Sequence, residues 1–261
     1  MNLYEELING LPEECEVTDV LVGDGTVLVS STVGTGLAPL IRQTGRPPVS
    51  VHRSIGMPLR DLASGVLSWN LKEASIGLAA LCSYYNAPAV AAAHGVSLDR
   101  SSHSNNRLAD PFISYQQFAR GKTVRVVGHF HYLAQLYEPV CDLAVLEFEP
   151  QEGDYPLYAA EWLLPGADLV MLNTATIPFK VLPRLLELAG GALVVLVGPG
   201  VPLAPTLNGH GIDDLSGFVV IDPGRARQLV SGQDEARFSA CGQKVSLRFA
   251  REESGGAYQL A

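Results

Sequence analysis

The stretch that decides the fold of this chain is Thr123-Val124-Arg125-Val126-Val127-Gly128-His129-Phe130. Its β-branched residues predict a strand that stops at Gly128. Residues 131–140 follow, with apolar side chains at the i, i+3, i+4 and i+7 spacing of one helix face. A strand, a tight turn and a helix in this order form the first half of a βαβ unit. Ligands of open α/β sheets bind beyond the carboxyl ends of the strands, so we expect a binding site at Gly128, His129 and Phe130.

Strands and helices alternate in the sequence that follows this unit. Further strands are predicted at residues 143–148, 169–173, 193–197 and 218–221. Their apolar runs are continuous, which is typical of parallel strands that are covered on both faces. We therefore predict an α/β protein in which residues 113–250 form a Rossmann-like parallel sheet with helices on both faces, followed by a frayed tail at residues 251–261.

The first part of the chain follows a different pattern. Gly23-Asp24-Gly25 separates two β-rich runs and so predicts a hairpin. Helices are expected within residues 59–85, where apolar side chains recur at helical spacing. A hairpin followed by helices indicates a smaller α+β domain over residues 1–100, and the polar stretch at residues 101–112 is the expected linker.

The composition excludes several classes of protein. The 261 residues are 47% hydrophobic and 17% charged, with a formal net charge of −9, so the chain is globular and has no basic run for nucleic acid. The four cysteines form no Cys-x-x-Cys pair, which predicts free thiols in a reducing compartment. Because no secretory signal and no apolar run of about 20 residues occurs, we expect a cytoplasmic protein without a membrane partner.

Several glycines and polar residues follow the predicted strands, and parallel strands bring their carboxyl ends to one edge. None of these short motifs identifies a binding site by itself, but together they line one edge of the predicted sheet. A helix N-terminus with a capping arrangement would join the site if it faces this edge. The predicted ligand-binding residues are Gly34, Gly36, Asn70, Glu73, Gly128, His129, Phe130, Glu147, Asn173, Thr174, Gly198 and Gly200.

The segment with Gly34 and Gly36 around Thr35 has two interpretations. Its backbone N–H groups can bind an anion, or the missing side chains can let another backbone approach closely. The alternative is a plain flexible connection between elements.

His129 and His131 form a His-x-His pair, whose two imidazoles could share a metal ion. If the chain is extended through both residues, their side chains point the same way; if a helix begins at His131, they diverge. Two histidines are too few for a closed site, so Glu73 or Glu147 would complete a set of nitrogen and oxygen ligands. We predict His129 and Glu73 as ligands of a divalent transition metal, with a half-buried turn as the alternative role of the histidines.

Glu147 follows Gly128 at about the spacing of the acidic residue in a dinucleotide fingerprint. Phe130 and Leu133 stand where the second and third glycines belong, which argues against ordinary NAD binding. The alternative function is an enzyme that uses S-adenosylmethionine or a nucleotide, with Glu147 on a ribose. Gly-x-Ser-x-Gly, Walker A and His-Glu-x-x-His motifs are absent from the sequence.

Seven short motifs together resemble the family of putative heavy-metal chelation proteins, and the similarity extends over roughly residues 3–247. The motifs are Asn9-Gly10 with Pro12, Gly34-Thr35-Gly36-Leu37, Ser68-Trp69-Asn70 with Glu73-Ala74-Ser75-Ile76-Gly77-Leu78-Ala79-Ala80, Val127-Gly128-His129-Phe130, Glu152-Gly153-Asp154-Tyr155-Pro156, Leu182-Pro183-Arg184-Leu185-Leu186-Glu187-Leu188 and Leu196-Val197-Gly198-Pro199-Gly200.

The resemblance implies two domains, the first similar to the enolase N-terminal fold and the second Rossmann-like, with a site in the cleft between them. It implies binding of a metal or of a metal-chelate small molecule, with a link to anaerobic corrinoid metabolism. A third hypothesis is a regulatory or assembly subunit whose cleft is vestigial. The apolar composition also favours a homo-oligomer.

Overall fold

A computed structural model gives the fold, and it describes residues 2–43, 46–48, 54–98, 110–130 and 132–250. The first part contains a three-stranded antiparallel sheet in the order β1-β2-β3. Its elements are α1 (Leu3–Asn9), β1 (Val17–Val22), β2 (Thr26–Ser31), β3 (Thr35–Pro39), α2 (Leu59–Ala63), η1 (Ser64–Leu67), α3 (Leu71–Tyr85) and α4 (Pro88–Ala93).

The second part is built around a seven-stranded sheet in the order β10-β9-β8-β7-β4-β5-β6, in which only β10 is antiparallel to its neighbour. Its elements are α5 (Pro111–Ser114), α6 (Gln116–Ala119), β4 (Thr123–Val127), α7 (Leu133–Tyr137), β5 (Asp142–Glu147), β6 (Tyr155–Pro156), η3 (Leu157–Ala159), α8 (Ala160–Leu163), β7 (Leu169–Asn173), η4 (Thr174–Thr176), α9 (Leu182–Leu188), β8 (Leu193–Val197), η5 (Pro205–His210), β9 (Asp214–Val220), α10 (Pro223–Val230), η6 (Phe238–Ala240) and β10 (Gly242–Arg248).

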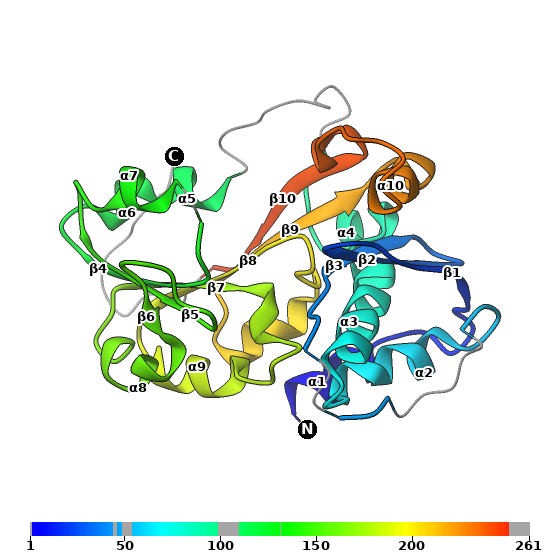
Figure 1. Ribbon diagram of the computed structural model, residues 1–261, viewed down its shortest axis with the longest axis horizontal. Helices are drawn as coiled ribbons and strands as arrows, with labels where there is room; N and C mark the ends of the chain where they lie inside the picture. The colour runs from blue at the N-terminus through cyan, green and yellow to red at the C-terminus, as the bar shows by residue number, and fades with distance from the viewer. Residues whose placement is uncertain (1, 44–45, 49–53, 99–109, 131, 251–261) are drawn as a thin grey trace.

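Helices cover both faces of the large sheet, as predicted for a Rossmann-like fold. Helices α5, α6 and α7 lie on one face, and α8 and α9 lie on the other (Figure 1). The first part of the chain lies at the β9 end of the sheet, on the right of Figure 1. Side chains of Phe112, Tyr115 and Tyr137 close the first face against Val126 and Val195. The sequence-based fold class is therefore confirmed. The proposed boundaries at residues 100, 112 and 250 remain a prediction.

Two strands and one helix differ from the sequence-based expectation. Residues 35–39, expected in a loop, form β3, because their backbone pairs with β2 from Thr26 to Ser30. Residues 242–248 form β10, which was not predicted, and which pairs along all of β9. The helix expected over residues 131–140 is only α7, Leu133–Tyr137.

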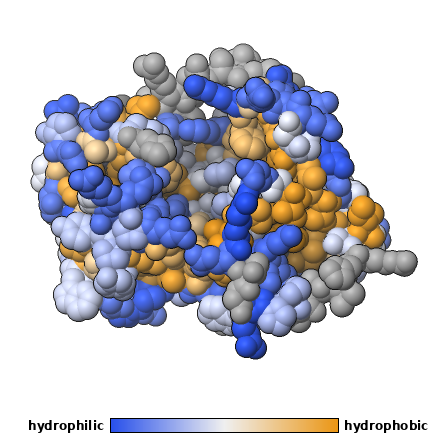
Figure 2. Space-filling view, in the orientation of Figure 1, coloured by the Kyte–Doolittle hydropathy of each residue, from blue (hydrophilic) through white to orange (hydrophobic). Residues whose placement is uncertain are grey.

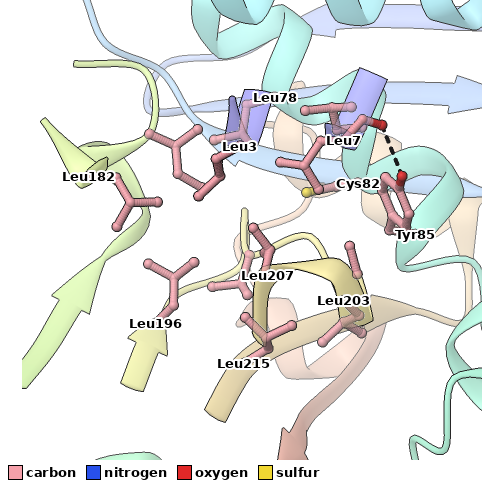
Figure 3. Close-up of a cluster of buried hydrophobic side chains, with 14 of the residues drawn as sticks. Leu3, Leu7, Leu78, Cys82, Tyr85, Leu182, Leu196, Leu203, Leu207 and Leu215 are labelled. Carbon is pink, nitrogen blue, oxygen red and sulfur yellow. Dashed lines mark hydrogen bonds between the residues drawn. The ribbon is translucent and has the colours of Figure 1, made fainter. Parts of the chain in front are cut away.

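The two parts of the chain share one hydrophobic core. Leu3, Leu7, Leu78 and Cys82 of the first part lie in the same buried cluster as side chains of the second part (Figure 3). Those of the second part that Figure 3 labels are Leu182, Leu196, Leu203, Leu207 and Leu215. Burial of this common cluster stabilises both sheets together, because neither part can expose its side of it without losing apolar contact.

Candidate functional site

The carboxyl ends of four neighbouring parallel strands lie side by side. Their order in the sheet is β8-β7-β4-β5, and these strands end next to Gly198, Asn173, Gly128 and Glu147. Successive strands are added on one side of β4 as β5 and β6, and on the other side as β7 to β9. The junction of β4 and β7 is therefore the topological switch point, where open α/β sheets bind their ligands.

At this switch point, the Asn173 side chain leaves no room for any residue other than glycine at position 128. Gly128 has a φ of +118°, and a Cβ there would lie 2.4 Å from the side-chain nitrogen of Asn173. The Asn173 side chain is itself held, because its Oδ1 accepts from the Ala175 N–H at 3.1 Å. One junction along, Gly198 has a φ of +137°, and a Cβ would lie 2.7 Å from Thr174 Oγ1. The glycines and polar residues predicted for this edge thus pack on one another.

The His129 imidazole is oriented by a carboxylate from the next loop. Its Nδ1 lies 2.9 Å from one oxygen and 3.1 Å from the other oxygen of Asp154. The Asp154 side chain is 5% exposed and the His129 side chain 24% exposed. Asp154 also accepts from the backbone N–H of Gln151 at 3.0 Å, and this second hydrogen bond fixes the orientation of the carboxylate. A hydrogen bond from Nδ1–H to a carboxylate selects the tautomer whose Nε2 accepts.

Glu147 uses both of its carboxylate oxygens within the protein. Oε2 accepts from the backbone N–H of His129 at 2.6 Å, and Oε1 accepts from the N–H of Phe148 at 2.7 Å. These bonds bind the end of β5 to the turn after β4. A ribose hydroxyl at Glu147 would have to compete with two backbone donors.

Asn70 and Glu73 lie at the start of α3, where the predicted capping box is half formed. Asn70 Oδ1 accepts from the Glu73 N–H at 3.1 Å, as expected. The Asn70 N–H donates to Ser68 Oγ at 3.1 Å, so the second half of the box is replaced by a hydroxyl. Both Asn70 and Glu73 are buried, and they border a hollow of about 580 Å³ with Leu62 and Ile76. Apolar side chains gather at the surface around β1 and α3, on the right of Figure 2.

Lys180, from the loop between η4 and α9, approaches this helix end from the second part of the chain. Its Nζ donates to the carbonyl oxygens of Ser68 and, at 2.8 Å, Pro178, and it lies 5.3 Å from the centre of the Trp69 ring. Burial lowers the pKa of Lys180 to about 8, although the Glu73 carboxylate acts in the opposite direction. Its φ of +58° is the only left-handed value of a non-glycine residue in the described part of the chain. Such backbone strain is tolerated where surrounding contacts fix the residue.

Gly34, Gly36 and Gly200 occupy positions of close packing. A Cβ at Gly36 would lie 2.2 Å from the Ser83 backbone nitrogen, and a Cβ at Gly34 would lie 2.6 Å from Ala87 Cβ. A Cβ at Gly200 would lie 3.0 Å from Pro39. At Gly36 the backbone of α3 approaches closely, which is one of the interpretations given for this motif.

The predicted residues border different hollows. Gly34 lines one beside α10, Asn70 and Glu73 line the hollow at α3, and Phe130 and Gly198 line an aromatic cavity at the end of β8. Among the residues that the structure describes, no three His, Cys, Asp or Glu side chains gather as a metal site, and His131 is not one of these residues. The histidine and carboxylates present therefore do not fit a metal ion held by protein ligands alone. In the same part of the chain, no helix is long and apolar enough to cross a bilayer.

Two residues of this region were not predicted from the sequence. Asp154 lies in the Gly153-Asp154 turn before β6, and its position next to His129 depends on the pairing of β5 with β6. Local sequence gives no signal for this contact, because a residue ahead of a parallel strand normally lies at the amino edge of the sheet. Asp154 comes near the carboxyl edge only because the short β6 pairs with Leu146 and Glu147, the last residues of β5. Lys180 also has no signal, since a lone lysine in a loop is usually solvated.

Two family models match this chain, and both carry the description putative heavy-metal chelation. The DUF364 model covers residues 110–247 and the DUF4213 model covers residues 4–85. Among curated proteins, none matches.

Two similar crystal structures are those of proteins of unknown function from the DUF364 family. The protein from Desulfitobacterium hafniense is 46% identical, with a TM-score of 0.87, over 95% of this chain and 98% of that one. The protein from Pyrococcus horikoshii is 18% identical, with a TM-score of 0.71, over 94% of this chain and 98% of that one. The second similarity supports the fold alone.

Proposed function

This chain belongs to the family of putative heavy-metal chelation proteins, and we propose that it binds a metal-chelate small molecule at the carboxyl edge of its large sheet. The cleft between the two parts of the chain is the proposed site, and His129 is the proposed protein ligand of the metal. The observation that carries this proposal is the pair of His129 Nδ1 and Asp154 at 2.9 Å. Histidines that bind metals commonly donate their second ring N–H to a carboxylate, which orients the ring and raises its basicity.

The donor set favours a chelate over a bare ion. Asp154 is used by the imidazole, and both oxygens of Glu147 are used by backbone N–H groups. Glu73, the second predicted ligand, has the Lys180 ammonium as a neighbour, which competes with a metal for its negative charge. The remaining positions around the metal would thus come from the small molecule. Imidazole suits divalent transition metals such as Zn²⁺, Ni²⁺ and Cu²⁺.

The test uses Ni²⁺–nitrilotriacetate, a chelate with open coordination positions. We expect it to raise the melting temperature of the parent by mass action, and we expect His129→Ala to lose this rise. The matched control is His210→Ala, because His210 Nε2 forms a similar pair with Glu6 at 2.9 Å and is 26% exposed, away from the sheet edge. Equal shifts in the parent and in His129→Ala would refute the assignment.

The same melting-temperature assay distinguishes binding of an adenine-containing cofactor from binding of a metal chelate. S-adenosylmethionine and ATP are added to the parent and to Glu147→Ala. A shift that appears with either compound and disappears in Glu147→Ala would favour the adenine-cofactor enzyme over chelate binding. The link to corrinoid metabolism remains a prediction from the resemblance.

A further inference from the structure

An apolar cavity of about 260 Å³ lies where the three-stranded sheet meets the carboxyl end of β8. Rings of Phe112, Phe130, Tyr132, Phe218 and Phe238 border it, and they come from four separate segments of the chain. The remaining wall includes Thr26 and Leu37 of the small sheet, and Gly198 of the large one. Tyr132 is 40% exposed and Phe238 37% exposed, so the cavity is open to solvent on the side of these two rings and a small molecule can enter it.

The rings form an ordered wall. Phe112 is fully buried, and its ring centroid lies 4.5 Å from that of Phe130 and 5.8 Å from that of Tyr132. The Phe112 and Tyr132 rings meet edge to face, at 79°. Offset and edge-to-face contacts are the arrangements that aromatic rings prefer, and a further flat ring can extend them.

The charged groups of the cavity already neutralise each other. Asp110 Oδ2 accepts from Lys244 Nζ at 2.8 Å and from the Tyr132 hydroxyl at 3.3 Å. Asp110 Oδ1 accepts from the Phe112 N–H at 3.1 Å, and the Asp110 side chain is only 14% exposed. A charged ligand would be buried among rings without a counter-charge, or would have to break this ion pair.

We propose that this cavity binds a neutral, planar aromatic molecule of one or two rings. An apolar cavity of about 150 Å³ can hold benzene, so a cavity of about 260 Å³ accommodates a bicyclic ring such as indole. Ligand pockets are typically apolar, with a few polar groups at one end, as Asp110 and Lys244 are here. The His129–Asp154 pair is not part of this wall, and the proposal does not depend on metal binding.

The test is a titration of the full chain with indole, followed by calorimetry and by the shift of the melting temperature. We expect saturable binding with one site in the parent. Benzoate, a planar ring with a negative charge, should bind at least tenfold more weakly. Binding of benzoate equal to that of indole would overturn the neutral class of ligand.

Two variants test the location of the site. Thr26→Phe adds a ring at the wall and should abolish indole binding, whereas Phe238→Ala removes a partly exposed ring at the start of η6 and should weaken it roughly tenfold. Tyr158→Ala is the control, because Tyr158 is 77% exposed and lies on η3, outside the cavity. Unchanged indole affinity in both wall variants, or absence of binding to the parent, would refute the proposal. We expect His129→Ala to bind indole as the parent does. Loss of the metal-chelate shift and loss of indole binding can then be told apart.

Discussion

Asn86 at the carboxyl end of α3 joins the two parts of the chain, and its removal should destabilise both. The residue is 1% exposed. Its Nδ2 donates to the carbonyl oxygens of Val201 at 2.8 Å and Phe218 at 3.1 Å, and its Oδ1 accepts from the Leu203 N–H at 3.0 Å. All three partners belong to the second part of the chain. Asn86→Ala deletes these bonds at one position.

The expected cost follows from three hydrogen bonds. A typical intramolecular hydrogen bond contributes about 1 kcal/mol net, and a buried group left without a partner costs about 1–3 kcal/mol. We therefore expect Asn86→Ala to lower the free energy of unfolding by about 3 kcal/mol or more. Asn208→Ala is the control, because Asn208 donates one bond, to the Ile212 carbonyl at 3.1 Å, and its loss should cost about 1 kcal/mol.

Urea unfolding followed by tryptophan fluorescence measures this effect in each part. The chain has two tryptophans, Trp69 in the first part and Trp162 in the second. In Trp69→Phe and Trp162→Phe backgrounds, the remaining tryptophan reports one part alone. We expect coincident transitions with both probes, and a shift of both midpoints by Asn86→Ala. Separate transitions in the parent, or a loss no larger than that of Asn208→Ala, would refute the reasoning.

Two further predictions concern a half-buried lysine and a packed glycine. The folded-state pKa of Lys180 is lowered to about 8, whereas an unfolded lysine titrates near 10.4. Between these values the unfolded chain binds more protons, so this group makes the free energy of unfolding rise with pH across that window. The stability of the parent relative to Lys180→Met should rise from pH 8 to 10.5 in urea titrations; a flat difference would contradict the burial argument. Gly36→Ala should cost about 2 kcal/mol or more in the same assay, because its Cβ would overlap the Ser83 nitrogen and the Ala79 carbonyl oxygen. Gly25→Ala, with open space at the Cβ, is its matched control, and equal costs for the two would show that packing at Gly36 is not limiting.

The strands that the sequence predicts correctly owe their conformation to their own composition. Residues 169–173 and 193–197 are continuous apolar runs, and their bounds agree with those of β7 and β8. Strand β3 contains glycine and proline, and it becomes a strand only because β2 pairs with it and α3 packs on Gly36. Strand β10 alternates polar and apolar residues, and only its pairing with the buried β9 fixes it.

The candidate site divides in the same way. The edge that collects Gly128, His129, Asn173 and Gly198 follows from strand order, so a sequence with four predicted parallel strands suffices to place it. Strand order does not predict Asp154 as the partner of His129, because Asp154 reaches the imidazole from the turn before β6. Contacts between loops depend on tertiary pairing, and local composition does not encode them.

The shared core bears on how a ligand would enter the cleft. Domains that close on a ligand meet at small, polar interfaces that permit a hinge. Here the two parts share a buried apolar cluster, and Asn86, Tyr4 and Lys180 add hydrogen bonds across the junction. Opening a hinge would expose this cluster and break those bonds. The proposed site is therefore preorganised, and specificity depends on the fixed position of the His129–Asp154 pair more than on closure of the cleft.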